Sequence, residues 1–451
     1  MTAAARIAAA PTASPAPEFS EDYLALDFVR RAAKFRWSPG PGWRIDDGVT
    51  WQRDEKMSRY TLARHVVRDA AARASTDKEA RGLASARVVN AVLSLAQTDR
   101  RIVVSNDEWD ADPLLLNTPG GVVNLRTGAL RARGNEYLTQ VARIAPAAAP
   151  CPVWLRFLDQ VFMGDQALIE FMRRAMGYFL TGLTHEQVLF FLYGDGANGK
   201  SVLIDLLQWL CGSYSIKLPA STLMQSKGER HPTELAQLFS KRLAVSSEVD
   251  EGSFFNESLI KELTGDKTLR ARYMRADFFE FTMQQKHVIV GNFKPRLRGG
   301  DPAIARRMLL VPFLASFKGA ARDPHMLDKL KAEGPAILHW MIQGAIVWAS
   351  EGLGIPEVVR AASADYMADH DDLALWMDEC CVRQGQAKAG DLYASFANWK
   401  KSRGEHAPSL TVWGSRLVAV AGITKHRSNG IRYAGIQLTT LEAMAVQELR
   451  R

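Results

Sequence analysis

The sequence predicts an α/β protein with a parallel sheet at its centre, and three observations support this fold class. Four continuous apolar runs, at residues 188–193, 242–247, 286–292 and 308–313, are typical of strands that are buried on both faces. A glycine-rich motif follows the first run and opens a helical segment. The regions before and after the four runs have helical or hairpin patterns, which indicate additional modules.

The glycine-rich motif is Gly194-Asp195-Gly196-Ala197-Asn198-Gly199-Lys200-Ser201, which fits G-x-x-x-x-G-K-[ST]. Glycines let the backbone turn tightly, so that its N–H groups and the helix N-terminus face phosphate oxygens. We expect Lys200 to reach the β- and γ-phosphates of ATP and the Ser201 hydroxyl to bind Mg²⁺. The alternative is a glycine turn that only caps a helix. The order of strand, loop and helix favours a nucleotide site, and hence a P-loop NTPase.

Acidic residues follow the second apolar run. Glu248 comes directly after it, with Asp250 and Glu251 close behind. In a nucleotidase, carboxylates at a strand end hold the metal and polarise the attacking water. Glu248 is therefore the candidate general base and metal ligand. An acidic cluster after a strand is more often a solvated loop, and the upstream motif is what favours the catalytic interpretation.

Two further strand ends carry residues that suit the same chemistry. Asn292 ends the third run, where a side-chain amide could hydrogen-bond the γ-phosphate or the lytic water. The alternative is an ordinary strand-to-turn asparagine. Arg306 and Arg307 precede the fourth run, and such an arginine can project into a neighbouring subunit to stabilise transition-state charge. Surface arginine pairs are otherwise usually solvated charge.

Composition indicates an ordinary globular protein, with 47% hydrophobic and 24% charged residues. The net charge of +8 favours a polyanionic partner. The four cysteines have neither zinc-site spacing nor the density of a disulfide scaffold, which predicts a reduced, cytoplasmic protein. No run approaches the ~20 apolar residues of a membrane span, so we expect no membrane partner.

Three regions are expected before the C-terminal module. Residues 1–20 form an Ala/Pro-rich disordered tail without the apolar segment of a signal peptide. Residues 21–150 form an N-terminal mixed α+β and helical module, which includes a small hairpin at 114–131. Residues 151–365 form the ATPase domain, which opens with a helical segment at 153–183.

The C-terminal module, residues 370–451, is basic, because Leu373–Arg451 contains 11 Lys/Arg and 6 Asp/Glu. A helix at 390–399, a second helix capped by Ser409 and two strands within 423–438 predict a winged-helix-like domain. We expect the proposed wing to contact duplex or forked DNA through Lys425, Arg427 and Arg432. The alternative is a wing that binds another protein.

These elements, in this order, resemble the superfamily 3 helicases, and most closely the phage/plasmid primase-helicase family that includes satellite-phage alpha proteins and the poxvirus primase-helicase. The resemblance covers roughly residues 109–435, where the segment 109–131 is similar to the family's pre-motor module. It is carried by GDGANGKS (194–201), RLAVSSE (242–248), IKELTGDKTLRARYMR (260–275), VIVGNFKPRLRGGD (288–301) and ARRMLLVPF (305–313).

The resemblance implies an AAA+-like motor that forms a hexameric ring, with ATP bound between subunits. It makes Glu248 the Walker B acid, Asn292 the sensor and Arg307 the preferred arginine finger, with Arg306 second. Many relatives have two adjacent acids after the second strand, whereas this chain has Ser247-Glu248. This difference leaves open which acid holds the metal and which activates water.

The segment between the second and third strands interleaves basic and aromatic residues, a pattern that suits single-stranded DNA. The family places a pore hairpin near here, and we assign Lys267, Arg270 and Arg272 to DNA contact. The alternative is that Arg270 and Arg272 pair with local acids while the phenylalanines belong to the core.

The expected function is that of an ATP-dependent DNA helicase of phage or plasmid replication, working with a separate primase or other replication proteins. The pair Asp110 and Asp112 superficially matches the D-x-D of primases, but only about a hundred residues precede it, and we predict no primase activity. A small-molecule kinase would lack the basic C-terminal module. An ATP-switched replication initiator without processive unwinding is the principal alternative.

Overall fold

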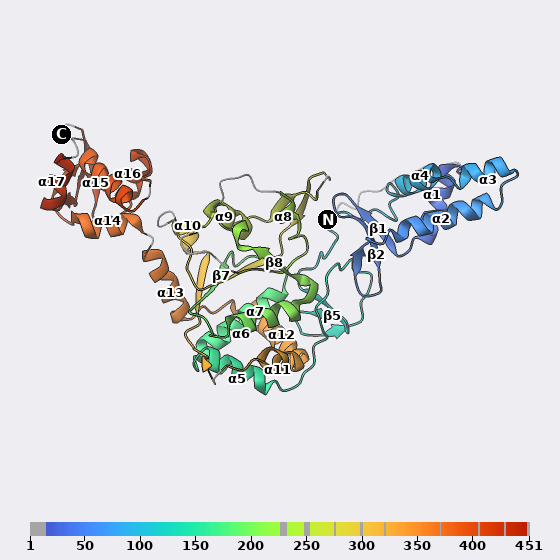
Figure 1. The fold of residues 1–451 in the computed structure, drawn as a ribbon, viewed down its shortest axis with the longest axis horizontal. Helices are drawn as coiled ribbons and strands as arrows, with labels where there is room; N and C mark the ends of the chain where they lie inside the picture. Colours follow the sequence, from blue (N-terminus) through green and yellow to red (C-terminus); the bar gives the residue numbers. More distant parts are fainter. Residues whose placement is uncertain are drawn as a thin grey trace, which may run out of the picture.

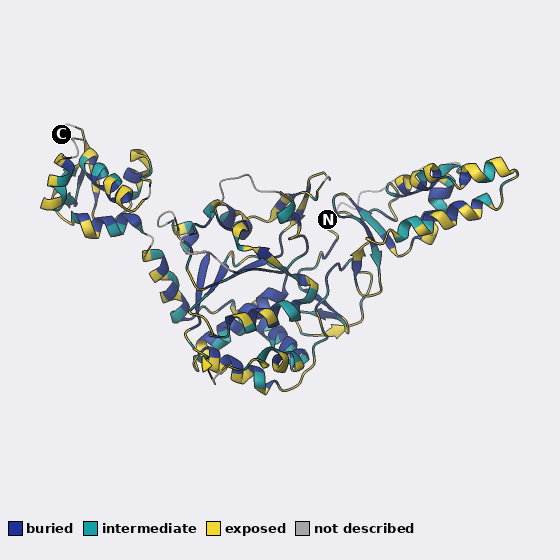
Figure 2. Cartoon of the chain, viewed as in Figure 1, coloured by how far each residue is buried: buried dark blue, intermediate teal, exposed yellow. Residues whose placement is uncertain are grey.

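The computed structural model describes residues 15–225, 232–247, 253–274, 277–297, 301–319, 322–369, 371–404, 406–427 and 430–448. Figure 1 shows three parts in a row: N-terminal helices at one end, a helix-covered sheet at the centre and the C-terminal module at the other end. Helix α13 (Glu357–Ala368) leads from the centre to the C-terminal module. Each part has its own buried core (Figure 2).

The N-terminal part is a helical arm joined to small antiparallel sheets. Its helices begin at serine or threonine caps where the sequence offers one, as Ser20, Thr76 and Ser85 do. The expected hairpin at 114–131 forms and carries a third short strand. The elements are α1 (Glu21–Arg31), β1 (Phe35–Ser38), β2 (Gly42–Asp46), β3 (Trp51–Arg53), α2 (Ser58–Ala71), α3 (Asp77–Leu83), α4 (Ala86–Ala96), β4 (Leu115–Thr118), β5 (Gly121–Asn124) and β6 (Leu130–Arg131).

The central sheet has five parallel strands in the order β13-β7-β12-β9-β8, so the α/β class with a parallel sheet is confirmed. The strands are β7 (Leu189–Tyr193), β8 (Ser215–Pro219), β9 (Leu243–Ser247), β12 (Lys286–Gly291) and β13 (Met308–Pro312). Strand β8 was not expected from the sequence. It is an edge strand in which only Leu218 is buried, so it lacks the continuous apolar pattern of the other four.

Both faces of the sheet are covered, which explains the apolar runs. Phe190, Leu192, Val245 and Val311 pack into one core with helices α5 (Pro152–Val161), α6 (Gln166–Leu180), α7 (Lys200–Cys211) and α12 (Gly334–Glu351). Leu189, Phe191, Ile289 and Leu310 pack into a second core with α9 (Glu257–Gly265) and α13. The remaining central elements are α8 (Pro232–Ala236), β10 (Thr268–Ala271), β11 (Phe279–Thr282), α10 (Pro302–Ala305) and α11 (Met326–Ala332).

The helical segment expected at 153–183 is two helices rather than one. Gly164 adopts a φ of +78°, and Asp165 then caps α6 by accepting a hydrogen bond from the Leu168 amide. Helix α6 packs closely on α12, because a Cβ at Gly177 would lie 2.1 Å from the Ala345 nitrogen and one at Gly344 would lie 2.2 Å from the Arg173 oxygen. Within the described residues, no helix is long and apolar enough to cross a membrane.

The C-terminal module packs its helices around Trp376, Phe396 and Trp413. The expectation of two strands within 423–438 was incomplete, because residues 437–438 leave the hairpin and pair with β14 instead. The elements are α14 (Asp372–Cys380), β14 (Cys381–Val382), β15 (Gln386–Lys388), α15 (Ala389–Ser402), α16 (Leu410–Val418), β16 (Thr424–Arg427), β17 (Ile431–Ala434), β18 (Gln437–Leu438) and α17 (Thr440–Glu448).

Two fully buried cations bind the C-terminal end of α6. Arg242 donates from Nη1 to the Leu180 oxygen at 2.6 Å and from Nη2 to the Leu115 oxygen at 2.8 Å, and Lys286 donates to the Thr181 oxygen. The last carbonyl groups of a helix have no intrahelical partners and carry the negative end of its dipole. Since Arg242 precedes β9 and Lys286 begins β12, the sheet is fastened to α6 and to the N-terminal hairpin.

Arg242→Ala should destabilise the protein by about 2–6 kcal/mol, because two buried carbonyl oxygens would lose their donor. The measurement is denaturant-induced unfolding followed by tryptophan fluorescence. Arg156→Ala, which removes an exposed arginine of α5, is the control and should change stability by less than about 0.5 kcal/mol. Equal stability of the two variants would contradict the role given to Arg242.

Candidate functional site

The glycine-rich loop lies between β7 and α7, at the carboxyl edge of the sheet. Gly194 adopts a φ of +145° and Gly199 a φ of +88°, both in a region that disfavours side chains. A Cβ at Gly194 would lie 2.2 Å from the Phe313 oxygen, and one at Gly199 would lie 2.7 Å from Cγ2 of Val161. These two glycines are therefore required by the close packing of the loop on its neighbours.

Asn198 fixes the middle of the loop. It is buried, and its Nδ2 donates to the Phe313 oxygen at 3.0 Å. Its Oδ1 accepts from Nζ of Lys200 at 3.1 Å. From the opposite direction, the Phe317 amide donates to the Ala197 oxygen at 2.7 Å. The end of β13 and the chain after it thus hold the loop in place.

The amine of Lys200 is the central polar group of the loop. Although the side chain is only 4% exposed, its Nζ donates to the Gly194 oxygen at 2.5 Å, to the Asp195 oxygen at 3.3 Å and to Oδ1 of Asn292 at 3.3 Å. Burial lowers the pKa of Lys200, and the carboxylate of Asp195 partly opposes this shift. The structure thus brings together Lys200 and Asn292, which are far apart in sequence.

A cavity of about 420 Å³ opens between the loop and the ends of β9 and β12. Its wall includes Ser201 together with Ser247 and Asn292 at two strand ends. Glu248, Asp250 and Glu251 lie outside the described residues. The cavity also contains polar residues that sequence reasoning missed, namely Asp205, Gln208 and Lys217. Asp205 and Gln208 follow Ser201 at helical spacing along α7, which was an available signal; Lys217 was missed together with its strand.

A second cavity, of about 430 Å³, lies on the other side of the same loop. The two cavities share Ala197, Asn198, Lys200 and Ser201. The walls of the second are more apolar and come from α5, from the chain after β13 and from α11, including Phe157, Phe317 and Met326. Gln160, Arg322 and Asp323 add polar groups. The loop therefore separates a polar cavity from a more apolar one.

Arg306 and Arg307 lie at the amino end of β13, whereas the glycine-rich loop lies at the carboxyl ends of the strands. Arg307 is buried; its Nε donates to Oγ1 of Thr264 at 3.1 Å, and its Nη1 donates to the Ala303 oxygen at 2.6 Å. Arg306 is exposed. Arg307, the preferred arginine finger, thus has hydrogen-bond partners within its own chain. Arg306, the second choice, lies at the surface.

The basic and aromatic segment forms the antiparallel hairpin β10–β11. Phe279 and Phe281 are buried, whereas Phe278 is 46% exposed. The guanidinium groups of Arg270 and Arg272 each lie 4.9 Å from the centre of the Phe278 ring, and both arginines are exposed. The hairpin therefore has an apolar inner face and a surface of two arginines around one aromatic ring.

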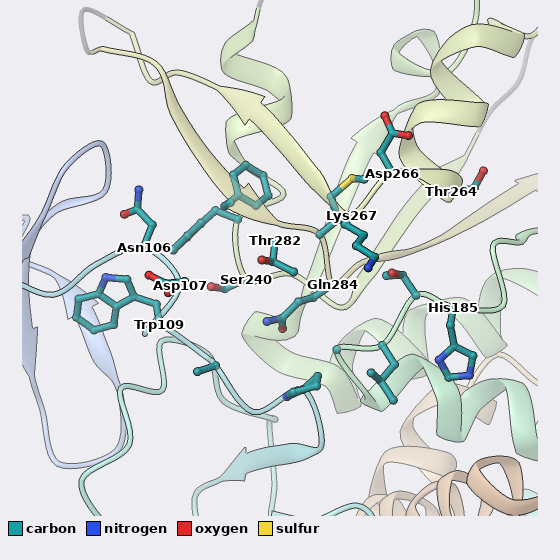
Figure 3. Close-up of a pocket in the computed structure, with 18 of the residues that line it drawn as sticks. Asn106, Asp107, Trp109, His185, Ser240, Thr264, Asp266, Lys267, Thr282 and Gln284 are labelled. Carbon is teal, nitrogen blue, oxygen red and sulfur yellow. The ribbon is translucent and has the colours of Figure 1, made fainter. Parts of the chain in front are cut away.

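Lys267 is placed differently from these two arginines. It lines a cavity of about 390 Å³ between the root of the hairpin and the segment 106–113 of the N-terminal part. Figure 3 shows its side chain pointing into that cavity, with Thr282, Ser240 and Gln284 nearby. Lys267 is therefore separate from the arginine pair at the hairpin surface.

The three basic residues of the C-terminal module lie on the hairpin β16–β17. Lys425 and Arg427 are exposed on β16, whereas Arg432 is half-buried on β17 opposite His426. Because directly paired residues share a face and successive residues along a strand point to opposite faces, Arg432 lies on the face opposite Lys425 and Arg427. The three cations do not form one surface.

Two regions of the chain match known family models. Residues 22–163 match a model described as "D5 N terminal like", and residues 192–307 match one described as "Family of unknown function (DUF5906)". The second match contains the loop and the strand ends that form the polar cavity.

Curated relatives come from viruses. "Putative helicase L207/L206" of Acanthamoeba polyphaga mimivirus is 24% identical over 264 residues, which are 53% of this chain and 27% of that protein. "Putative helicase 022R" of Frog virus 3 (isolate Goorha) is 26% identical over 287 residues, or 57% of this chain and 29% of that protein. The chain thus spans less than a third of the length of these relatives.

A solved structure described as "The A form apo structure of NrS-1 C terminal region-CTR" aligns with 92% of this chain and 98% of that chain, at a TM-score of 0.48 and 9% identity.

The fold and the site define an α/β protein with a glycine-rich loop at the carboxyl edge of a parallel sheet. The matches to the D5-like model and to viral helicases fit the phage and viral primase-helicase family, which confirms the resemblance seen in the motifs.

Gly194→Ala should lower the thermal stability of the protein, because the added Cβ would collide with a backbone oxygen that cannot move without shifting the end of β13. Gly196→Ala is the matched control: a Cβ there meets nothing within 4 Å, so its melting temperature should stay within the error of the wild type. Differential scanning fluorimetry measures both. An equal drop in the two variants would show that the packing at Gly194 is not the constraint.

Proposed function

We propose that the chain is an ATP-dependent DNA helicase of phage or plasmid replication, which hydrolyses ATP between subunits of a homo-hexameric ring and moves along single-stranded DNA to unwind duplex. The observation that carries the proposal is the buried amine of Lys200. This amine donates hydrogen bonds to backbone oxygens of the loop and to the side chains of Asn198 and Asn292. A triphosphate would replace these neutral oxygens with anionic ones, whose Coulomb attraction to the ammonium group adds to the hydrogen bonds.

The two cavities beside the loop suit the two halves of a nucleotide. The polar cavity, with Ser201, Lys217 and Asn292, suits the phosphates and the attacking water. The more apolar cavity, with Phe157, Phe317 and Met326, suits the base. The loop between them would contact the phosphates through its backbone amides.

Mg²⁺ fits the donors of the polar cavity. This ion keeps several of its waters and needs only one or two protein ligands besides the phosphates. Within the described part of the chain, no cluster of three or more His, Cys, Asp or Glu residues could form an all-protein metal site. The hydroxyl of Ser201, which lines the polar cavity, would serve as one ligand. The Glu248 carboxylate would be the second ligand or the general base. When bound, the ion would neutralise charge on the β- and γ-phosphates.

One of the two arginines before β13 would act as the finger of a neighbouring subunit. The internal hydrogen bonds of Arg307 favour Arg306 for direct contact, with Arg307 shaping the surface on which Arg306 lies. If Arg307 is the finger, it must first release Thr264 and Ala303.

Single-stranded DNA would bind at the hairpin β10–β11, where the two arginines supply charge and Phe278 supplies a stacking face. Forked or duplex DNA would bind the C-terminal module, a winged-helix-like domain in this proposal, through the exposed Lys425 and Arg427, with Arg432 on the other face of the hairpin.

An ATP-switched replication initiator is the second candidate. It is favoured by the position of the hairpin β16–β17 in the C-terminal module, apart from the nucleotide loop. Strand displacement on a forked substrate separates the two functions, because an initiator would bind DNA and hydrolyse ATP without displacing a strand.

Lys200→Ala should lower ATP affinity or turnover at least about tenfold, since one charge-assisted hydrogen bond contributes roughly 1.5–3 kcal/mol. The measurements are equilibrium binding of ATP with Mg²⁺ and steady-state hydrolysis with and without single-stranded DNA. The control is Lys318→Ala, which removes an exposed lysine at the same edge of the sheet and should leave both values unchanged. If Lys200→Ala bound and hydrolysed ATP like the wild type, the nucleotide site proposed here would be wrong.

Replacing Arg270 and Arg272 together by alanine should weaken binding of single-stranded DNA and reduce the slope of log affinity against log salt by about 1.4 units, the value for two lost phosphate contacts. Basal ATP hydrolysis without DNA should be retained. The control removes two exposed arginines of α2, Arg64 and Arg68, and so matches the loss of charge. Equal slopes for the two double variants would assign the DNA surface to general charge rather than to the hairpin.

A further inference from the structure

The chain that follows Asn292 is fastened to a helix from outside the nucleotide-binding motifs. Pro295, three residues after Asn292, is buried, and its carbonyl oxygen accepts a hydrogen bond from the hydroxyl of Tyr366. Tyr366 belongs to α13, the helix that leads to the C-terminal module (Figure 1). This contact spans more than seventy positions of the chain and ends three residues after Asn292, whose side chain accepts a hydrogen bond from Lys200.

Lys294 strengthens the same junction. Its amine lies 4.4 Å from the centre of the Tyr193 ring and 5.9 Å from that of the Tyr366 ring, within the range of cation–π attraction. Tyr193 is the last residue of β7 and directly precedes Gly194. The junction therefore joins three pieces of chain: the start of the glycine-rich loop, the segment after Asn292 and α13.

Tyr366 can supply its hydrogen bond over the whole physiological pH range. Its side chain is 1% exposed, and burial, with a smaller contribution from the carboxylate of Glu257, raises the pKa of its hydroxyl far above the ordinary value. The group therefore remains a neutral donor, and the Pro295 carbonyl remains its acceptor.

Helix α13 has a second polar contact with the centre of the protein, which provides a comparison. Oγ of Ser363, one turn before Tyr366, accepts a hydrogen bond from the Leu310 amide at 3.0 Å. Leu310 lies within the edge strand β13, away from Asn292. Among the described residues, Tyr366 thus attaches α13 to the segment after Asn292, and Ser363 attaches the same helix to the edge strand β13.

From these contacts we infer that Tyr366 is a positioning residue for Asn292, so that nucleotide hydrolysis depends on how α13, and through it the C-terminal module, is seated. The inference rests on the proposed function, because it assigns Asn292 to the hydrolytic step. Tyr366 is not among the described residues that line the polar cavity. Its effect on turnover passes through the segment from Phe293 to Pro295.

Tyr366→Phe is the central variant, because it keeps the buried ring and removes only the hydroxyl. We expect kcat for ATP to fall about fivefold, the effect of one typical hydrogen bond, while KM changes less than twofold. Ser363→Ala is the matched control, since it also removes one hydrogen bond between α13 and the centre, and its kcat should match the wild type. An equal loss in both variants would mean that α13 acts only as general support, and the inference would fail.

The pathway through Asn292 is tested by combining variants. If Tyr366 acts by positioning Asn292, adding Tyr366→Phe to Asn292→Ala should cause no further loss of kcat, because the group being positioned is already gone. Adding Tyr366→Phe to Arg306→Ala should still cause the fivefold loss. Multiplicative losses in the Asn292→Ala background would overturn the inference.

Hydrogen–deuterium exchange of the nucleotide-free protein tests the junction without relying on activity. Tyr366→Phe should speed exchange in the peptide containing residues 291–297, and Ser363→Ala should not. Unchanged exchange in Tyr366→Phe would overturn the inference whatever the ATPase results. If exchange rises as expected but the wild-type protein neither binds nor hydrolyses ATP, the proposed function fails, and the coupling to hydrolysis fails with it.

Discussion

A buried ammonium group surrounded by neutral oxygens is the constraint on which the arrangement of the loop depends. Moving a charge out of water is costly unless other dipoles replace the lost solvent, and the Gly194 and Asp195 carbonyls with Asn198 and Asn292 do so for Lys200. Among the described residues Lys200 makes no ion pair, so its charge is solvated by the protein but not neutralised. A site of this kind favours an anion over a neutral ligand, and each oxygen around the amine also fixes the strand end or turn that carries it.

Buried charges surrounded by dipoles also occur at the amino ends of the strands, where they stabilise the fold. Arg242 and Lys286 are buried among the last carbonyl groups of α6 and a strand of the N-terminal hairpin, where helix and backbone dipoles replace the lost water. Burial lowers the pKa of Lys286 well below its usual value, and the nearby charge of Arg242 adds to this effect. Buried cations thus lie at both ends of the strands: Arg242 and Lys286 bind backbone oxygens within the fold, whereas Lys200 lines a cavity.

The sequence predicted those parts that depend on local pattern, and it missed those that depend on distant contacts. The four buried strands and the loop could be read directly, because an apolar run or a glycine motif carries its own signal. Strand β8 has Lys217 and Pro219 within it and only one buried side chain, so nothing local distinguished it from a loop. The burial of Arg307 could not be predicted either, since its partners Thr264 and Ala303 are brought to it only by the fold. Lys200 and Asn292 were both named from motifs, but their contact is a property of β12 lying next to β7.

The positions of the loop and the arginines limit how the proposed motor could work. In a parallel sheet all carboxyl ends lie at one edge, and a strand the length of β13 separates its two ends by about 17 Å. Arg306 therefore cannot reach the loop of its own chain, and any role in hydrolysis requires a second copy whose loop faces the amino edge of the first. Such a contact joins two different surfaces, so it is head-to-tail, and repeating it gives a closed ring or an open helical filament. Hydrolysis would then require assembly whether the protein unwinds DNA continuously or only switches an origin complex, and the seating of α13 would add a second requirement within each subunit.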